Sequence, residues 1–227
     1  QEVALQAARE GIVLLKNEKN ILPLRKDIKR IAVIGPNADN EINQLGDYTA
    51  KIILQDIVTV LEGIKAKVSS KTIVEYIKGC DVIGAEYNDV LSARKIAAAS
   101  DAVIIVLGES AWGTPERAIT NGEGYDVASL DLTGIQEELL KAVYKTGTPT
   151  ILVLINGRPL SIPWAAENIP AIVEAWLPGE QGGYAVADII FGDYNPNGKL
   201  PVTIPPHHVI LLGTVNAQIL LVCSAPR

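Results

Sequence analysis

Short apolar runs dominate the hydrophobic pattern of this 227-residue chain. Four of them, rich in Val, Ile, Leu and Ala, cover Ile31 to Ile34, Ala102 to Leu107, Thr150 to Ile155 and Ala171 to Ala175, the last interrupted by one Glu. Continuous apolar runs of this length predict strands buried on both faces, as in a parallel sheet. Thr72 to Ile77 alternates apolar and polar residues and predicts a further strand.

Segments with apolar residues close to helical spacing separate these runs. They predict helices over Glu2 to Lys16, Ile57 to Val68, Glu86 to Ala99, Gly134 to Thr146 and Tyr184 to Phe191. The alternation predicts an α/β fold, a three-layer α/β/α sandwich with a mainly parallel, roughly six-stranded sheet. Pro159 to Ile162 is expected to pair only briefly. We expect one domain over residues 1–206 and an atypical apolar tail over residues 207–227.

Composition excludes several classes of protein. A formal net charge of −6 predicts no nucleic-acid surface, and no apolar run reaches the roughly 18 residues that span a membrane. The start, QEVALQAARE, does not resemble a signal peptide, and the lack of Met predicts a processed chain or an excised fragment. Cys80 and Cys223 predict two free buried thiols, with a single disulfide bridge as the alternative. Two histidines without CxxC or HExxH predict no metal or other cofactor. The compartment stays undetermined.

The candidate chemistry gathers in one long segment, Gly108 to Leu132 (GESAWGTPERAITNGEGYDVASLDL). It has no clear period, and long irregular loops in compact domains are usually functional or disordered. It follows the predicted end of a strand, where open α/β sheets bind ligands. Glu123 stands between two glycines that let the backbone approach a ligand. Glu109 and Glu116 are lesser candidates for a catalytic carboxylate. The alternative role of Glu109, which follows a buried strand, is to accept hydrogen bonds from loop amides.

Several long blocks, in the same order, resemble the C-terminal α/β sandwich domain of glycoside hydrolase family 3. They include AREGIVLLKNEKNILPL, IAVIGPNADN, GEGYDVASLDLTGIQEELLKAV, ILVLINGRPLSIPWAAENIPAIVEAWLPGEQGG and ADIIFGDYNPNGKLPVTIP. The resemblance covers Gln1 to about Pro205. This family contains β-glucosidases, β-xylosidases and related exo-acting enzymes.

The resemblance implies half of a two-carboxylate active site. In the family a TIM-like barrel supplies an aspartate nucleophile, and a loop like that of Gly108 to Leu132 supplies the acid/base glutamate. Glu123 best matches the acid/base position. A retaining glycosidase holds its two carboxyl groups about 5–5.5 Å apart, and its acid needs a raised pKa. We therefore expect this chain, which lacks the barrel, to need it as a partner and to be inactive on glycosides alone.

Aromatic and acidic neighbours are candidate sugar-binding residues. Trp112, Tyr125 and Tyr48 offer ring faces on which a sugar stacks. Tyr48 belongs to a block, LGDYTA, that resembles the family loop on the aglycone side, and Asp126 completes the Glu123 motif. The family usually has Arg after this Asp, where the chain has Val127. The loss of this cation is expected to change the anchoring of the loop or the pKa of Glu123.

The tail and two other functions stay open. Residues 207–227 are apolar and unlike the family's usual continuation, so this tail, or the barrel-facing surface, is a candidate homodimer contact.

The first alternative function is a carboxylesterase for small esters. Ser110 would be the nucleophile, His207 or His208 the base, and Asp126 would orient that histidine, although GxSxG is lacking. Another is a non-catalytic carbohydrate-binding module that uses Trp112 and Tyr48.

Overall fold

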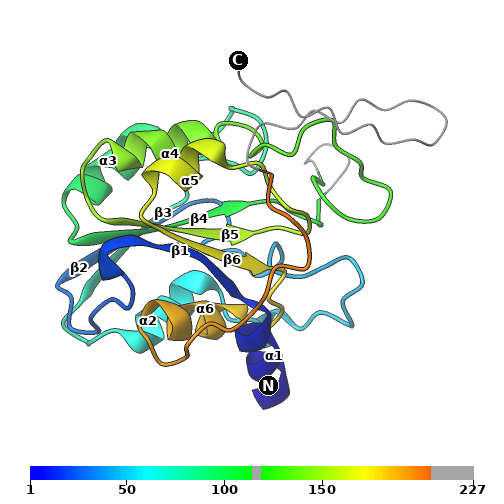
Figure 1. Cartoon of the computed structure of the whole chain (residues 1–227), viewed down its shortest axis with the longest axis horizontal. Helices are drawn as coiled ribbons and strands as arrows, with labels where there is room; N and C mark the ends of the chain where they lie inside the picture. Colours follow the sequence, from blue (N-terminus) through cyan, green and yellow to red (C-terminus); the bar gives the residue numbers. More distant parts are fainter. Residues whose placement is uncertain (114–118, 206–227) are drawn as a thin grey trace.

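The computed structural model of the chain describes residues 1–113 and 119–205. Six strands form one sheet in the order β1-β6-β5-β4-β2-β3 (Figure 1). Their bounds are β1 Val13–Asn17, β2 Arg30–Ile34, β3 Ile73–Ile77, β4 Ala102–Gly108, β5 Thr150–Ile155 and β6 Ala171–Trp176. Neighbours from β3 to β6 pair in parallel, whereas β1 pairs antiparallel with β6. The predicted mainly parallel sheet is confirmed.

Helices cover both faces of the sheet (Figure 1). One layer holds α1 (Glu2–Gly11), α2 (Val60–Lys67) and α6 (Gly182–Ile190), and the other holds α3 (Val90–Ala98), α4 (Gln136–Tyr144) and α5 (Pro163–Asn168). Two separate clusters of buried apolar residues lie between the sheet and these layers. Alternate residues of β4 and β5 enter the two clusters, because successive side chains of a strand point to opposite faces. The three-layer sandwich is therefore confirmed.

The first predicted helix, Glu2 to Lys16, is wrong in its last five residues. Helix α1 ends at Gly11, and Val13–Asn17 forms the edge strand β1. Val13 pairs with Glu174 and Asn17 with Ala171, so this segment gains sheet hydrogen bonds. Val13 is buried, and Leu14 and Leu15 pack against the two apolar clusters on opposite faces of the sheet. The apolar residues of this segment fit helical spacing by themselves, and the tertiary partner decides between the two structures.

Two other boundaries depend on local chemistry. Helix α2 begins at Val60 rather than Ile57, because Thr59 and Glu62 form a reciprocal capping box. The predicted short pairing of Pro159 to Ile162 is a single bridge between Ser161 and Asp131, and Pro163 then opens α5. Within the described residues, no helix is long and apolar enough to cross a membrane.

The strand order determines where the loops meet. After β2 the chain adds β3 on one side, and it later returns to add β4 on the other side of β2. The connections that follow β2 and β4 therefore emerge at the same edge of the sheet and lead in opposite directions. Such a point forms a crevice in open α/β sheets and is the usual place for a ligand.

Candidate functional site

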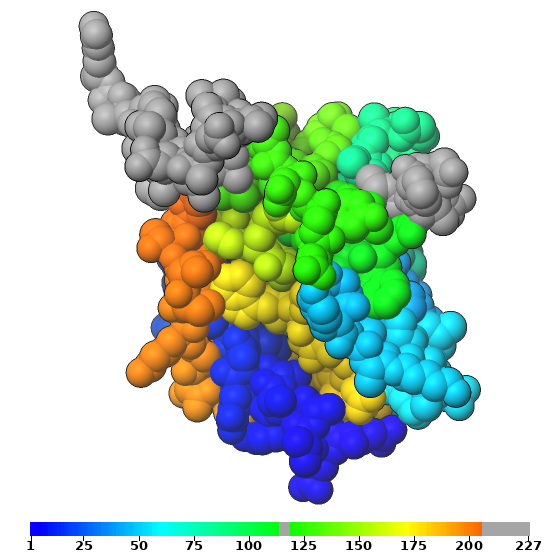
Figure 2. All heavy atoms as spheres, turned by 90° about the vertical axis from the view of Figure 1, so that its right-hand side faces the viewer, coloured from blue at the N-terminus to red at the C-terminus, as the bar shows by residue number. Residues whose placement is uncertain are grey.

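The loops after β2, β4 and β5 gather at the carboxyl edge of the parallel strands. The loop after β2, around Asp47, and the loop after β4, around Glu123, lie side by side in two views (Figures 1 and 2). Between these loops and Arg158, after β5, lies an open hollow of about 450 Å³. Its lining includes Asp47, Tyr48, Asn121, Glu123, Tyr125, Asp126 and Arg158.

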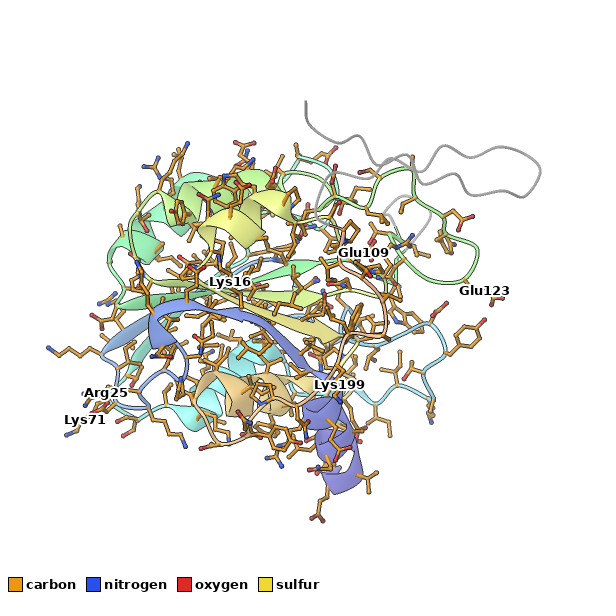
Figure 3. All side chains as sticks on the ribbon, in the orientation of Figure 1. Lys16, Arg25, Lys71, Glu109, Glu123 and Lys199 are labelled. Atoms are coloured by element: carbon orange, nitrogen blue, oxygen red, sulfur yellow. The ribbon has the colours of Figure 1, made fainter. Side chains whose placement is uncertain are left out.

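Glu123 lies at the outer end of this loop, with its carboxylate in reach of solvent (Figure 3). The Tyr48 hydroxyl donates a hydrogen bond to that carboxylate, and the Glu123 backbone N–H donates to Asp47 Oδ2 at 2.8 Å. Gly122 has a positive φ of 116°, and a Cβ there would lie 3.1 Å from Asp47 Oδ2. Glycine is thus needed at this turn for its backbone conformation and for the close approach of Asp47.

Three of the four predicted sugar-binding residues lie with Glu123. Tyr48 is 78% exposed and Tyr125 is 47% exposed, so both rings are accessible. Asp126 lines the same hollow. The hydrogen bond to Glu123, with smaller effects of burial and of the Asp47 charge, raises the pKa of Tyr48 above its ordinary value.

Trp112 occupies a different place. Its ring is half-buried, and its Nε1–H donates to the carbonyl oxygen of Leu45 at 3.2 Å. It lines a second hollow of about 850 Å³ together with residues that follow β2 and β3, among them Asn40, Lys78 and Tyr87. Trp112 therefore supports the base of the Leu45 to Tyr48 loop and does not line the Glu123 hollow.

Ser110 of the esterase alternative is buried, at 4% exposure. Its Oγ lies 2.7 Å from Asn43 Oδ1 and 2.7 Å from the Trp112 carbonyl oxygen, and it accepts from Trp112 N–H at 3.1 Å. The Ser110 hydroxyl thus stabilises the turn that follows β4 through these hydrogen bonds. His207 and His208 lie outside the described residues, as does Glu116, so the serine–histidine arrangement stays a prediction.

A buried polar cluster beneath the hollow contains residues that sequence reasoning missed. Arg158 Nε lies 3.2 Å from Glu109 Oε1, and Arg158 Nη2 donates to the carbonyl oxygens of Thr120 and Tyr125 at 2.8 and 3.0 Å. Asn121 Nδ2 approaches Glu109 Oε2 at 3.4 Å. Figure 3 shows Glu109 inside the molecule, on the same side as Glu123. The signal in the sequence was a single Arg directly after a buried strand and its Asn-Gly turn.

Glu174 on β6 is an acidic residue that sequence reasoning missed. It has no exposed surface, its Oε1 accepts from Trp176 N–H at 2.9 Å, and its Oε2 accepts from Asn156 Nδ2 at 3.3 Å. Burial raises the pKa of Glu174 to about 8, and the nearby charge of Glu109 acts in the same direction against these two hydrogen bonds. The available signal was a lone Glu in an otherwise apolar predicted strand.

The effect of burial on the pKa of Glu109 is offset by more neighbours than at Glu174. Burial raises the pKa of Glu109 above the ordinary range, whereas Arg158, Asn121 and the Gly157 N–H favour its ionised form.

Over the described ranges, no group of three or more His, Cys, Asp or Glu side chains is placed to hold a metal ion. Cys80 is free and buried, as predicted, while Cys223 lies outside the described residues.

Comparison with known proteins identifies the family. Residues 12–218 match the family model described as "Glycosyl hydrolase family 3 C-terminal domain". A β-xylosidase from Formosa agariphila is 46% identical over 210 residues, which cover 90% of this chain and 28% of that protein. A periplasmic β-glucosidase from Salmonella typhimurium is 35% identical over 225 residues, with 89% and 28% of the two chains covered.

Solved structures agree. A β-glucosidase from Erythrobacter marinus superposes with a TM-score of 0.77 at 37% identity, covering 90% of this chain and 30% of that one. A β-glucosidase from Listeria innocua, in complex with isofagomine, gives 0.78 at 32% identity, covering 89% and 27%. The chain thus spans between about a quarter and a third of each relative. By sequence and by fold, it belongs to glycosyl hydrolase family 3, as the α/β domain that stands C-terminal in that family.

Proposed function

We propose that this chain supplies the general acid/base of a retaining β-glycosidase and that Glu123 is that residue. A second domain, a barrel that carries the carboxylate nucleophile, completes the site. The proposed substrates are β-glucosides or β-xylosides, because the relatives with the same domain are named β-xylosidase and β-glucosidase. On this proposal the chain by itself does not hydrolyse glycosides.

The presentation of Glu123 supports this role more than any other observation. Its side chain reaches outward at the carboxyl edge of the sheet, while its backbone is tied to Asp47 and its carboxylate to Tyr48. A general acid must reach the leaving oxygen, so an outward carboxylate on a tethered loop is suitable. Tyr48 and Tyr125 flank it with accessible rings, as expected for a place that receives a sugar.

The need for a second domain follows from the same geometry. A retaining mechanism requires a nucleophilic carboxylate about 5–5.5 Å from the acid, on the other side of the scissile bond. Asp47, the neighbouring carboxylate, accepts the Glu123 N–H and so serves the loop. The hollow is open on its outer side, where a barrel would close it and exclude water.

The test is a fusion protein. The full chain replaces the matching region of the Formosa agariphila β-xylosidase, and kcat/KM is measured with a methyl and a 2,4-dinitrophenyl β-xyloside. Replacing Glu123→Gln should lower kcat/KM on the methyl xyloside by about 10²–10⁴-fold, the usual contribution of general acid catalysis. The dinitrophenyl xyloside should change less than about tenfold, because its leaving group needs no proton.

Azide provides an independent readout. Water needs a general base to attack the covalent intermediate, whereas azide is already an anion and needs none. Azide should therefore restore kcat of Glu123→Gln on the dinitrophenyl xyloside and yield a β-xylosyl azide. Glu167→Gln, an exposed carboxylate on α5, is the matched control and should behave as the parent does. Equal losses on both xylosides, without azide rescue, would reject Glu123 as the acid/base.

A further inference from the structure

The segment that carries Glu123 has no helix or strand of its own between Thr120 and Tyr125. Arg158 joins its two ends. One nitrogen, Nη2, donates to the Thr120 carbonyl oxygen at 2.8 Å and to the Tyr125 carbonyl oxygen at 3.0 Å. Since Glu123 lies between these carbonyls, the guanidinium closes the loop around the acid/base position.

Glu109 in turn holds Arg158. The ion pair joins Nε to Oε1 at 3.2 Å, and the two side chains are 20% and 3% exposed. Glu109 directly follows β4, and its backbone N–H donates to the Ile155 carbonyl oxygen at 2.8 Å, which continues the pairing of β4 with β5. Glu109 therefore fixes the position of the guanidinium relative to β4 and β5, the two central strands of the sheet.

The chemistry of this contact requires arginine. A guanidinium is planar and holds its nitrogens in a fixed fork, so Nε forms the ion pair with Glu109 while Nη2 donates to two backbone carbonyls. A lysine ammonium is a point charge on a flexible chain, so it can neutralise Glu109 but cannot hold all three partners in this geometry. Arg158→Lys therefore keeps the positive charge beside Glu109 but removes the paired hydrogen bonds to the Thr120 and Tyr125 carbonyl oxygens.

We propose that Arg158, oriented by Glu109, is a positioning residue that sets the place of the Glu123 carboxyl for proton transfer. This inference rests on the function proposed for Glu123. In this proposal neither Arg158 nor Glu109 touches the reacting atoms. Proton transfer needs the donor within hydrogen-bond reach of the leaving oxygen, and misplacement of a catalytic group by 1 Å can cost about 10²-fold in rate.

The experiment uses the same fusion protein and the same two xylosides. Arg158→Lys should lower kcat/KM on the methyl xyloside by about 10–100-fold and change it on the dinitrophenyl xyloside by less than about threefold. A loss of general stability would lower both values in parallel. The matched control is Arg9→Lys, because Arg9 also pairs with a buried carboxylate, Asp188, with exposures of 27% and 1%, but joins α1 to α6. It should show no dependence on the leaving group.

Hydrogen exchange on the full chain gives a second measurement that needs no activity. Arg158→Lys should speed exchange of the Thr120 to Tyr125 amides by at least about tenfold, and Arg9→Lys should not. If Arg158→Lys does not fold, Glu109→Gln replaces it, with the same selective loss expected at about 3–10-fold. Equal losses on both xylosides, or unchanged exchange of the loop, would overturn the inference. If Glu123→Gln shows the selective loss and Arg158→Lys does not, only the positioning role fails; if Glu123→Gln does not show it, the proposed function fails first.

Discussion

Glu174 offers the sharpest test of the electrostatics beneath the hollow. Its side chain has no exposed surface and lies on β6, bonded to the side-chain amide of Asn156 and to the backbone N–H of Trp176. Replacement by Gln keeps its size and removes its proton equilibrium. Oδ1 of Asn156 has no hydrogen-bond donor among the described residues, so a small rotation lets it accept from the new amide. We therefore expect Glu174→Gln to fold.

The magnitude follows from the difference between the two states. Burial raises the pKa of Glu174 from its ordinary 4.5 to about 8. Between these values the unfolded chain releases the proton while the folded chain keeps it, so the free energy of unfolding falls as pH rises through this window. Above about pH 8 the folded carboxyl ionises as well, and the fall ends. At about 1.36 kcal/mol per pH unit, the upper limit is roughly 5 kcal/mol, and relaxation of the site reduces it to about 2–5 kcal/mol.

The assay is urea unfolding, followed by tryptophan fluorescence, at intervals from pH 4.5 to 9. The difference in free energy of unfolding between Glu174→Gln and the parent should rise by about 2–5 kcal/mol across the window, because other titrating groups cancel. Glu75→Gln is the control, since Glu75 lies on the edge strand β3 with its side chain 36% exposed beside Arg30. If the Glu174→Gln difference stays constant within about 0.5 kcal/mol from pH 5 to 8, the folded carboxyl is ionised and the reasoning is refuted.

Three smaller predictions test other parts of the structure. Gly63→Ala should lower the free energy of unfolding by about 3 kcal/mol in urea titration, because its Cβ would overlap a carbonyl oxygen of α6, whereas Gly11→Ala, with open space around it, should change stability by less than about 0.5 kcal/mol. Burial raises the pKa of Cys80 from 9.0 to about 12, so at pH 8 it should react with iodoacetamide roughly a thousandfold more slowly than an exposed thiol, as peptide mapping will show; rapid labelling would contradict its burial. Glu123→Gln should lower the pKa of Tyr48 in an ultraviolet difference titration, and an unchanged value would mean that the Tyr48 hydroxyl is not bonded to that carboxylate.

The site could be predicted only in part from the sequence. Glu123 is a candidate because its motif best matches the family's acid/base position, and Tyr48 because its block resembles a family loop. Their contact is between residues 75 positions apart, and no local pattern describes it. Trp112 carried the same aromatic signal but faces another hollow. A ring in a loop indicates a candidate, and the path of the backbone decides what it lines.

The sequence by itself determined the class of fold, the family and most strands. Strands buried on both faces are largely apolar, so β4 and most of β2 and β5 are visible as continuous apolar runs, and β6 as a run interrupted only by Glu174. The tertiary structure decided β1, because Val13–Asn17 becomes a strand only when β6 offers its edge. It also decided the cluster of Glu109, Arg158 and Glu174, which follow or belong to three different strands. The Glu109–Arg158 ion pair and the effect of the Glu109 charge on Glu174 depend on strand order, which is a property of the folded sheet that no single segment encodes.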